Sequence, residues 1–248
     1  LSLAKKLVKK AKECGADAIK FQTFKAESLC SKKSQYFNLF MTLQLNRDEW
    51  IEIARLARSL NIIFLSTPFD EDAVDLLNNL RVPAFKVASG DLTYLPFLEY
   101  IAKKKKPIIL STGMSTISEI DEALYTIYST GNKKVILLHC VSNYPANAKD
   151  VNLKAINTLE QIFKVPIGFS DHTQGVLMPI AVVCLGAKVI EKHFTLNKNL
   201  PGPDHKLSLD PEEFEGMVKQ IRIVEQALGN GKKIPCKSEE KIKKLLQT

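Results

Sequence analysis

Short apolar runs and longer amphipathic segments alternate along this chain, and no other feature restricts its fold as much. Seven runs have the continuous hydrophobicity of strands buried on both faces. They cover residues 16–23, 62–69, 84–90, 107–113, 134–140, 166–172 and 189–195. A segment with helical periodicity follows each run, and one more helix, at residues 2–14, precedes the first strand. Strict strand–helix alternation is typical of a parallel sheet.

The number of these units predicts a closed barrel. Eight strand–helix units form a TIM barrel, whereas this sequence has seven strands and an additional helix ahead of them. We therefore expect an α/β fold, a (β/α)8 TIM barrel over residues 1–230, whose first strand is missing from this chain. An open doubly wound sheet is the competing fold. The sequence lacks the GxGxxG and GxxxxGK[ST] turns that often accompany such sheets.

Composition excludes several other classes of protein. No apolar run reaches the roughly 18–20 residues of a membrane helix, so no membrane partner is expected. The five cysteines are widely spread and form no CxxC pair, which favours a reducing cytoplasm over a disulfide or zinc framework. The net charge of +8 reflects a lysine-rich surface, and it suits an anionic small substrate better than a nucleic acid.

All seven expected strands end in polar or ionisable residues. Active sites of TIM barrels lie at these carboxyl ends, so the side chains should converge. Lysines supply charge and hydroxyls supply directional donors, which together suit a phosphate and a carboxylate. The candidates for this anion site are Lys20, Thr67, Lys86, Ser89, Ser111, Ser142 and Ser170. Any single hydroxyl could instead cap a helix, as Thr116 is expected to do.

His172 and His193 follow the last two expected strands, which are neighbours in a barrel. Two imidazoles there could share a divalent ion that water and substrate oxygens complete, or they could simply be hydrogen-bonded without a metal. Glu191 lies on the same strand face as His193, because side chains two apart point the same way. Its carboxylate could bind the metal, accept a substrate hydroxyl or move a proton. For His139 and His205 we expect core packing and surface exposure, respectively.

Two irregular segments border the expected mouth of the barrel. Residues 24–45 show no clear period and could form a lid or a subunit contact. Residues 199–210 follow the last strand and contain two prolines and a glycine, which stiffen and turn the chain. This second loop should hold Asp204 over the mouth, where its carboxylate could bind sugar hydroxyls.

Seven motifs, in this order, resemble the sialic acid synthase family. They are KFQT, STPFD, KVASGD, LSTGMST, GFSDHT, EKHFT and PGPD. The match covers nearly the whole chain, and EKHFT followed by PGPD is more similar to the neuraminate and legionaminate branches than to the pseudaminate branch. The resemblance implies a phosphoenolpyruvate-condensing transferase. Its acceptor would be the open-chain aldehyde of a 2-acetamido sugar, N-acetylmannosamine or a 2,4-diacetamido analogue.

The resemblance also implies a mechanism and a set of site residues. Phosphoenolpyruvate C3 attacks the aldehyde, water adds at C2, and phosphate leaves by C–O cleavage. Mn²⁺, or alternatively Mg²⁺ or Co²⁺, is held by His172 and His193 and polarises the aldehyde oxygen. Glu191, Lys86 and His193 are the expected catalytic residues. The residues expected around phosphoenolpyruvate are Lys20, Thr67, Lys86, Ser89, Ser111 and Ser170, and those by the sugar or intermediate are Gln22, Tyr144, Glu191 and Asp204.

The sequence departs from the family pattern at several points. Ser142 stands where the family often has Asn, with Asn143 beside it, so which one contacts phosphate is open. Asp91 replaces a common Glu and shortens a sugar contact. The family's first strand carries a catalytic Glu, and its C-terminal antifreeze-like domain sends an Arg into the partner's site. We therefore expect a homodimer, and we interpret residues 231–248 as a linker toward that absent domain.

Three other functions compete with this one. Another phosphoenolpyruvate-dependent synthase of 3-deoxy sugar acids would need a second phosphate site, and no spare basic cluster stands at an expected strand end. A non-catalytic barrel that binds an anionic sugar would show binding without metal dependence. A metal-dependent hydrolase would usually show an HxH pair or a bridging carboxylate, and the sequence contains neither at the expected positions.

Overall fold

The computed structural model describes residues 1–202 and 204–247. Pro203, within the PGPD motif, and Thr248, at the end of the expected linker, lie outside the described residues.

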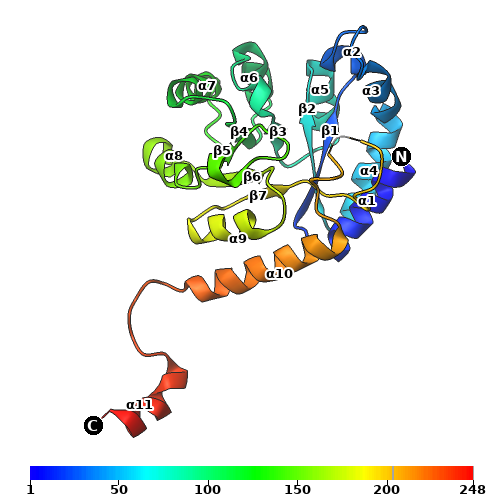
Figure 1. The fold of residues 1–248 in the computed structure, drawn as a ribbon. Helices are drawn as coiled ribbons and strands as arrows, with labels where there is room; N and C mark the ends of the chain where they lie inside the picture. The colour runs from blue at the N-terminus through cyan, green and yellow to red at the C-terminus, as the bar shows by residue number, and fades with distance from the viewer. Residues whose placement is uncertain (203, 248) are drawn as a thin grey trace.

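Seven parallel strands form the wall of an incomplete barrel (Figure 1). The strands are β1 (Ala18–Thr23), β2 (Ile63–Pro68), β3 (Phe85–Val87), β4 (Ile108–Ser111), β5 (Val135–Cys140), β6 (Ile167–Asp171) and β7 (Ile190–Lys192). β1 pairs with β2, and β3 to β7 pair with one another in chain order. Within the described part of the chain, no strand joins β7 to β1, which is where an eighth strand would close the barrel. The predicted TIM barrel lacking its first strand is confirmed.

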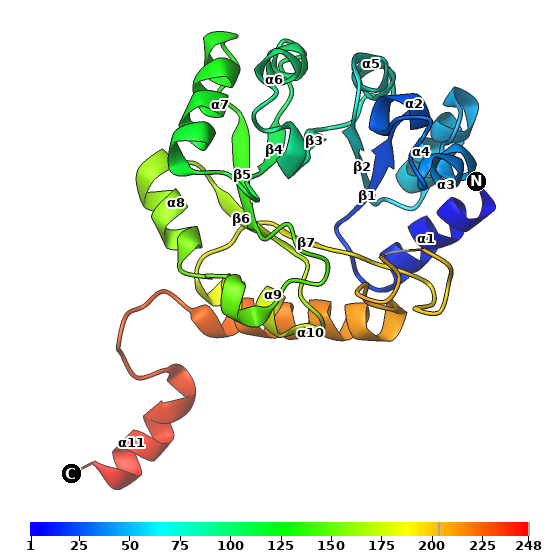
Figure 2. The same ribbon diagram turned by 45° about the horizontal axis from the view of Figure 1, so that its top comes forward.

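Helices lie outside the strands, as Figure 2 shows. Those of the barrel are α1 (Ser2–Glu13), α4 (Arg47–Ser59), α5 (Glu71–Asn79), α6 (Leu95–Ala102), α7 (Ile117–Ser129), α8 (Ala155–Phe163), α9 (Leu177–Cys184) and α10 (Pro211–Leu228). Capping boxes at Asn46, Thr116 and Asp210 begin α4, α7 and α10, because each side chain accepts a backbone N–H that the first helical turn leaves unpaired.

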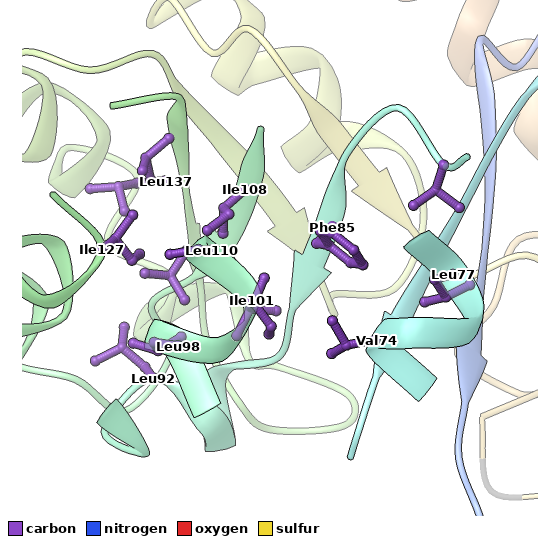
Figure 3. Close-up of a cluster of buried hydrophobic side chains, with 14 of the residues drawn as sticks. Val74, Leu77, Phe85, Leu92, Leu98, Ile101, Ile108, Leu110, Ile127 and Leu137 are labelled. Carbon is purple, nitrogen blue, oxygen red and sulfur yellow. The ribbon is translucent and has the colours of Figure 1, made fainter. Parts of the chain in front are cut away.

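The hydrophobic core lies between the strands and this ring of helices (Figure 3). Phe85, Leu110 and Leu137 on the strands are fully buried, as are Leu98 and Ile127 on the helices that cover them. Burying a side chain of this size stabilises the fold by about 1.5–3 kcal/mol relative to leaving it in water. The core therefore holds the strands rigidly, and the polar residues at their carboxyl ends are held with them.

A cavity of about 370 Å³ occupies the gap between β7 and β1. Its apolar wall includes Leu7 on α1, Ile19 on β1, Ile190 on β7 and Phe214 on α10. These side chains come from elements on both sides of the gap, which is the arrangement expected around the place of a missing strand. At its other end the cavity opens onto polar residues of the strand ends, described below.

Residues 24–45 are more regular than their sequence pattern indicates. They contain two short helices, α2 (Ala26–Leu29) and α3 (Phe37–Leu43). The rings of Phe24 and Phe40 meet edge to face at 5.7 Å, and Gln44 Oε1 accepts the backbone N–H of Ala26 at 3.0 Å. Contacts within the segment organise it, and such contacts leave no periodic signal.

The chain beyond α10 makes no buried contact within the described residues. It holds a turn of 3₁₀ helix (Lys237–Glu239) and α11 (Glu240–Leu246), and neither has a buried residue. In Figure 1 this tail extends away from the barrel. That it links to a further domain stays a prediction. Of the described helices, none combines the length and hydrophobicity needed to cross a membrane.

Candidate active site

A cluster of opposite charges lies at the carboxyl ends of β1, β3 and β7. Lys20 Nζ is 3.1 Å from Glu191 Oε1, and Lys86 Nζ is 3.5 Å from Glu191 Oε2. Hydroxyls hold both ammonium groups, because Lys20 donates to Thr67 Oγ1 at 3.3 Å and Lys86 donates to Ser111 Oγ at 2.7 Å. Glu191 thus has a reason to lie at a strand end, since two cations flank it.

The ionisation of this cluster follows from its geometry. Burial alone would raise the pKa of the Glu191 carboxyl, but the ammonium groups of Lys86 and Lys20 outweigh it and lower the pKa to about 2. Burial lowers the pKa of Lys86, and the Glu191 carboxylate opposes that effect. Glu191 is therefore a carboxylate at neutral pH, able to accept a proton or a hydrogen bond but not to donate one.

Hydroxyl and thiol groups surround Gly113, in the loop between β4 and α7. Its backbone N–H donates to Ser89 Oγ at 3.0 Å, and that hydroxyl also lies 3.2 Å from Cys140 Sγ. A Cβ atom at Gly113 would stand only 2.4 Å from Ser142 Oγ. The absence of a side chain therefore lets these groups meet. Ser142 faces this loop whereas Asn143 is exposed, so the geometry favours Ser142 as the anion contact.

The two expected metal-binding histidines come together beside the charged cluster. β6 and β7 are hydrogen-bonded neighbours with Ser170 opposite Glu191, and the ring centroids of His172 and His193 are 5.6 Å apart. The ring of Tyr144 lies 4.2 Å from that of His172 and 5.8 Å from that of His193. The strand ends that the sequence analysis places together are thus adjacent.

Burial affects the ionisation of both imidazoles, and a hydrogen bond orients one of them. Burial lowers the pKa of His172, and it lowers the pKa of His193 to about 4 although Asp204 opposes this, so both rings are neutral at pH 7. The Nδ1 atom of His172 lies 2.7 Å from the carbonyl oxygen of Val141. A neutral ring must donate through Nδ1 there, so its Nε2 atom carries the lone pair and faces the hydroxyl of Ser170 at 3.4 Å. His193 Nδ1 is 3.8 Å from Asp204 Oδ2.

These residues fit an open divalent-metal site. The imidazoles supply two nitrogen donors, and the buried Glu191 Oε2 atom has no hydrogen-bond partner. Over residues 1–202 and 204–247, no group of three or more His, Cys, Asp or Glu side chains could enclose an ion. A metal here would accordingly take further ligands from water and substrate.

The remaining predicted residues border this centre at different depths. Gln22 is exposed, and it lines the cavity between β1 and β7 together with Asp204. Asp91 lies in a turn of 3₁₀ helix after β3, where its Oδ2 atom is buried without a hydrogen-bond partner. Burial raises its pKa, and Lys86 opposes this. Ser170 Oγ is 3.4 Å from His172 Nε2.

Two histidines fall outside the centre, one as predicted and one only in part. His139 packs against Phe169 and bonds to the carbonyl of Val151 at 2.7 Å, so the expected core role is confirmed. His205 was expected at the surface, and it is only partly exposed. Its Nδ1 atom lies 2.8 Å from the buried hydroxyl of Thr195 and ties the 199–210 loop to the end of β7. Sequence alone shows no signal of this contact, because ten residues of irregular chain separate the partners.

Fold and site together define a class of protein. The chain is an α/β-barrel protein with two lysines, several hydroxyls and a pair of neutral imidazoles at its strand ends. It matches the NeuB family over residues 7–233 and belongs to that family.

Proteins of similar sequence include named synthases of this family. The chain is 46% identical to the N,N'-diacetyllegionaminic acid synthase of Legionella pneumophila, across 100% of this chain and 74% of that protein. It is 38% identical to the N-acetylneuraminate-9-phosphate synthase of Homo sapiens, across 95% of this chain and 70% of that protein.

Solved structures of similar fold include a member of the same family. A sialic acid synthetase from Leptospira borgpetersenii, in complex with citrate, superposes with a TM-score of 0.92 at 34% identity, across 98% of this chain and 85% of that one. The chain is therefore an enzyme of the sialic acid synthase type. A 3-deoxy-D-arabino-heptulosonate 7-phosphate synthase from Thermotoga maritima has a TM-score of 0.75 at 18% identity, a likeness of fold alone.

Proposed function

We propose that this enzyme condenses phosphoenolpyruvate with the open-chain aldehyde of a 2-acetamido sugar to form a nonulosonic acid. A bond forms between C3 of phosphoenolpyruvate and the aldehyde carbon, and the aldehyde oxygen takes a proton to become a hydroxyl. Water adds at C2, and the C2–O bond to phosphate then breaks, which releases inorganic phosphate and leaves a 2-keto acid.

The observation that carries this proposal is the juxtaposition of a two-lysine anion site with two neutral imidazoles across Glu191. Lys20 and Lys86 supply two positive charges within 3.5 Å of one carboxylate. Phosphoenolpyruvate carries a phosphate and a carboxylate, and both need such charge. The hydroxyls of Ser89, Ser111 and Ser142 would add directional donors.

We assign the divalent metal to His172 and His193, with Mn²⁺ as the first candidate. When bound, the metal would polarise the aldehyde oxygen of the acceptor. The protein residues orient this site, since the Nδ1 contact of His172 with Val141 directs its Nε2 atom away from the backbone. The ring of Tyr144 packs against both imidazoles.

Glu191 is the residue we assign to proton movement near the new bond. Its pKa of about 2 makes it a base and not an acid in the unliganded enzyme. Once the anionic substrate binds, Lys20 and Lys86 divide their charge between substrate and Glu191, so the basicity of the carboxylate rises. Gln22 and Asp204 line the same cavity as this carboxylate, and we assign them, together with Asp91, to the sugar side.

The test is phosphate release from phosphoenolpyruvate by the full-length protein, with N-acetylmannosamine and Mn²⁺. We expect release that requires both sugar and metal, stops with EDTA, and falls at least about a hundredfold in His193→Ala. His139→Gln is a matched control, because that histidine faces the helices and not the site.

Two outcomes would redirect the proposal. Faster release with a 2,4-diacetamido sugar would assign a legionaminate branch. No release with either sugar, from a folded protein that binds phosphoenolpyruvate, would favour another 3-deoxy sugar acid synthase or a non-catalytic anionic-sugar-binding barrel.

A homodimer in the cytoplasm is also part of the proposal. Sedimentation of the full-length protein tests the dimer.

A further inference from the structure

A buried ion pair joins the two strand ends that carry the imidazoles, on the face away from the site. Lys192 Nζ lies 2.5 Å from Asp171 Oδ2, and both side chains are completely inaccessible to solvent. Asp171 precedes His172 and Lys192 precedes His193. Because side chains alternate along a strand, the charged pair points outward where the histidines point inward.

The ion pair also holds the backbone directly after His172. Asp171 Oδ1 accepts the N–H of Thr173 at 2.9 Å, and Lys192 Nζ donates to the carbonyl of Thr173. Asp171 and Lys192 are register partners across β6 and β7. One network therefore fixes the residue after His172 and the residue before His193.

Stability does not explain why charges occupy this place. Desolvating two ions costs about as much as their attraction returns, and an apolar pair of similar volume is often as stable or more stable. Register does explain it. β7 has only three residues, and only three register pairs join it to β6. A slip by one residue would turn Glu191 and His193 out of the site and Lys192 into it.

We propose that Asp171 and Lys192 are positioning residues, which lock the register of β7 against β6 and hold the His193 ring opposite His172. Asp171 is the one acidic partner of Lys192 in this network. A slipped register would therefore leave the charges of both side chains unpaired. The effect on metal binding rests on the proposed function, whereas the effect on the ring positions does not.

The experiment compares the wild type with the double variant Asp171→Leu/Lys192→Met, which leaves no lone buried charge. Asp75→Leu/Lys104→Met is the matched control, because that pair has the same 2.5 Å separation but joins α5 to the segment after α6. Four quantities are measured for each protein: the Tm, the Kd of phosphoenolpyruvate without metal, the Kd of Mn²⁺ by electron paramagnetic resonance, and the His172–His193 distance in a crystal structure.

For the double variant we expect a Tm close to that of the wild type, unchanged affinity for phosphoenolpyruvate, and Mn²⁺ affinity weaker by about tenfold or more. The ring centroids should depart from their 5.6 Å separation. The control should match the wild type in all four quantities.

Unchanged ring positions in a folded double variant would overturn the inference, whatever its metal affinity. If the wild type itself binds no Mn²⁺, the proposed metal site fails, and the ring distance still decides the positioning role. Should the double variant not fold, Asp171→Asn/Lys192→Met keeps an acceptor for Thr173 and undergoes the same measurements. Failure of both variants to fold would assign the pair a structural role and overturn the proposal.

Discussion

At the scale of single residues, the environment of each group decides its chemistry. Glu191 and Asp91 are both carboxyl groups at strand ends of the same barrel. Lys86 and Lys20 hold the pKa of Glu191 down, whereas burial raises the pKa of Asp91. Glu191 therefore stays charged under conditions in which Asp91 takes up a proton more readily, and the two carboxyl groups suit different tasks.

Replacing Glu191 with glutamine should separate binding from chemistry. The variant removes the charge that neutralises Lys20 and Lys86, so we expect phosphoenolpyruvate to bind roughly two- to fivefold more tightly. Loss of the base should lower kcat by about a hundredfold or more. Calorimetry and steady-state phosphate release measure the two effects, with Glu52→Gln as a control at an exposed ion pair with Lys5. Weaker phosphoenolpyruvate binding in Glu191→Gln would contradict the assignment.

His139 should make the fold sensitive to acid. Burial lowers the pKa of this imidazole, although its bond to Val151 opposes the shift. The folded state therefore keeps the ring neutral, while the unfolded chain binds a proton below about pH 6.5. The free energy of unfolding should fall as the pH drops below that value, because the unfolded state binds more protons.

Urea unfolding of the wild type and His139→Gln between pH 7 and pH 5 tests this effect. The variant lacks the titrating ring, so its free energy of unfolding should decline less over the same range. An equal decline in both proteins would show that His139 does not contribute.

At the scale of elements, the loops after the strands matter as much as the strands. The loop after β4 brings Gly113 against groups from two other segments, Ser89 after β3 and Cys140 and Ser142 at the end of β5. None of these contacts is local in sequence. The proposed anion site therefore depends on loop packing as well as on the strands that hold Lys20 and Lys86, and a small change in one loop should disturb it.

Gly113→Ala should damage the anion site. The added Cβ would stand 2.4 Å from Ser142 Oγ, 2.9 Å from Ser89 Oγ and 3.0 Å from Cys140 Sγ. Overpacking of this kind costs about 1–3 kcal/mol, so we expect a lower Tm and phosphoenolpyruvate binding weaker by roughly tenfold. Gly90→Ala is the matched control, because a Cβ there would meet no atom within 4 Å. Equal binding by both variants would argue against a role for this loop.

At the scale of the whole molecule, the described part of the tail after α10 contributes no buried side chain. Residues 231–247 are exposed throughout, whereas Met217 and Ile221 on α10 are buried against the barrel. The domain boundary near residue 230 and the role of the tail as a linker stay predictions.

Removing residues 232–248 should leave the barrel intact. We expect the Tm to change by less than about 1 °C, since each kcal/mol corresponds to about 2–4 °C in a protein of this size. Ending the chain at residue 220 would remove Ile221 and should lower the Tm by several degrees. Calorimetry of both shortened chains tests the boundary, and a large loss in the first would mean that the tail packs on the barrel.

The sequence by itself determined the barrel, the missing strand and the neighbourhood of His172 and His193. These follow from periodicity and chain order, since parallel strands joined by helices must present their carboxyl ends at one face. The tertiary structure decided that Glu191 lies between Lys20 and Lys86, and that Asp171 pairs with Lys192. Strand register and loop packing set those contacts, and neither register nor packing across a barrel is encoded in the local pattern of any one segment.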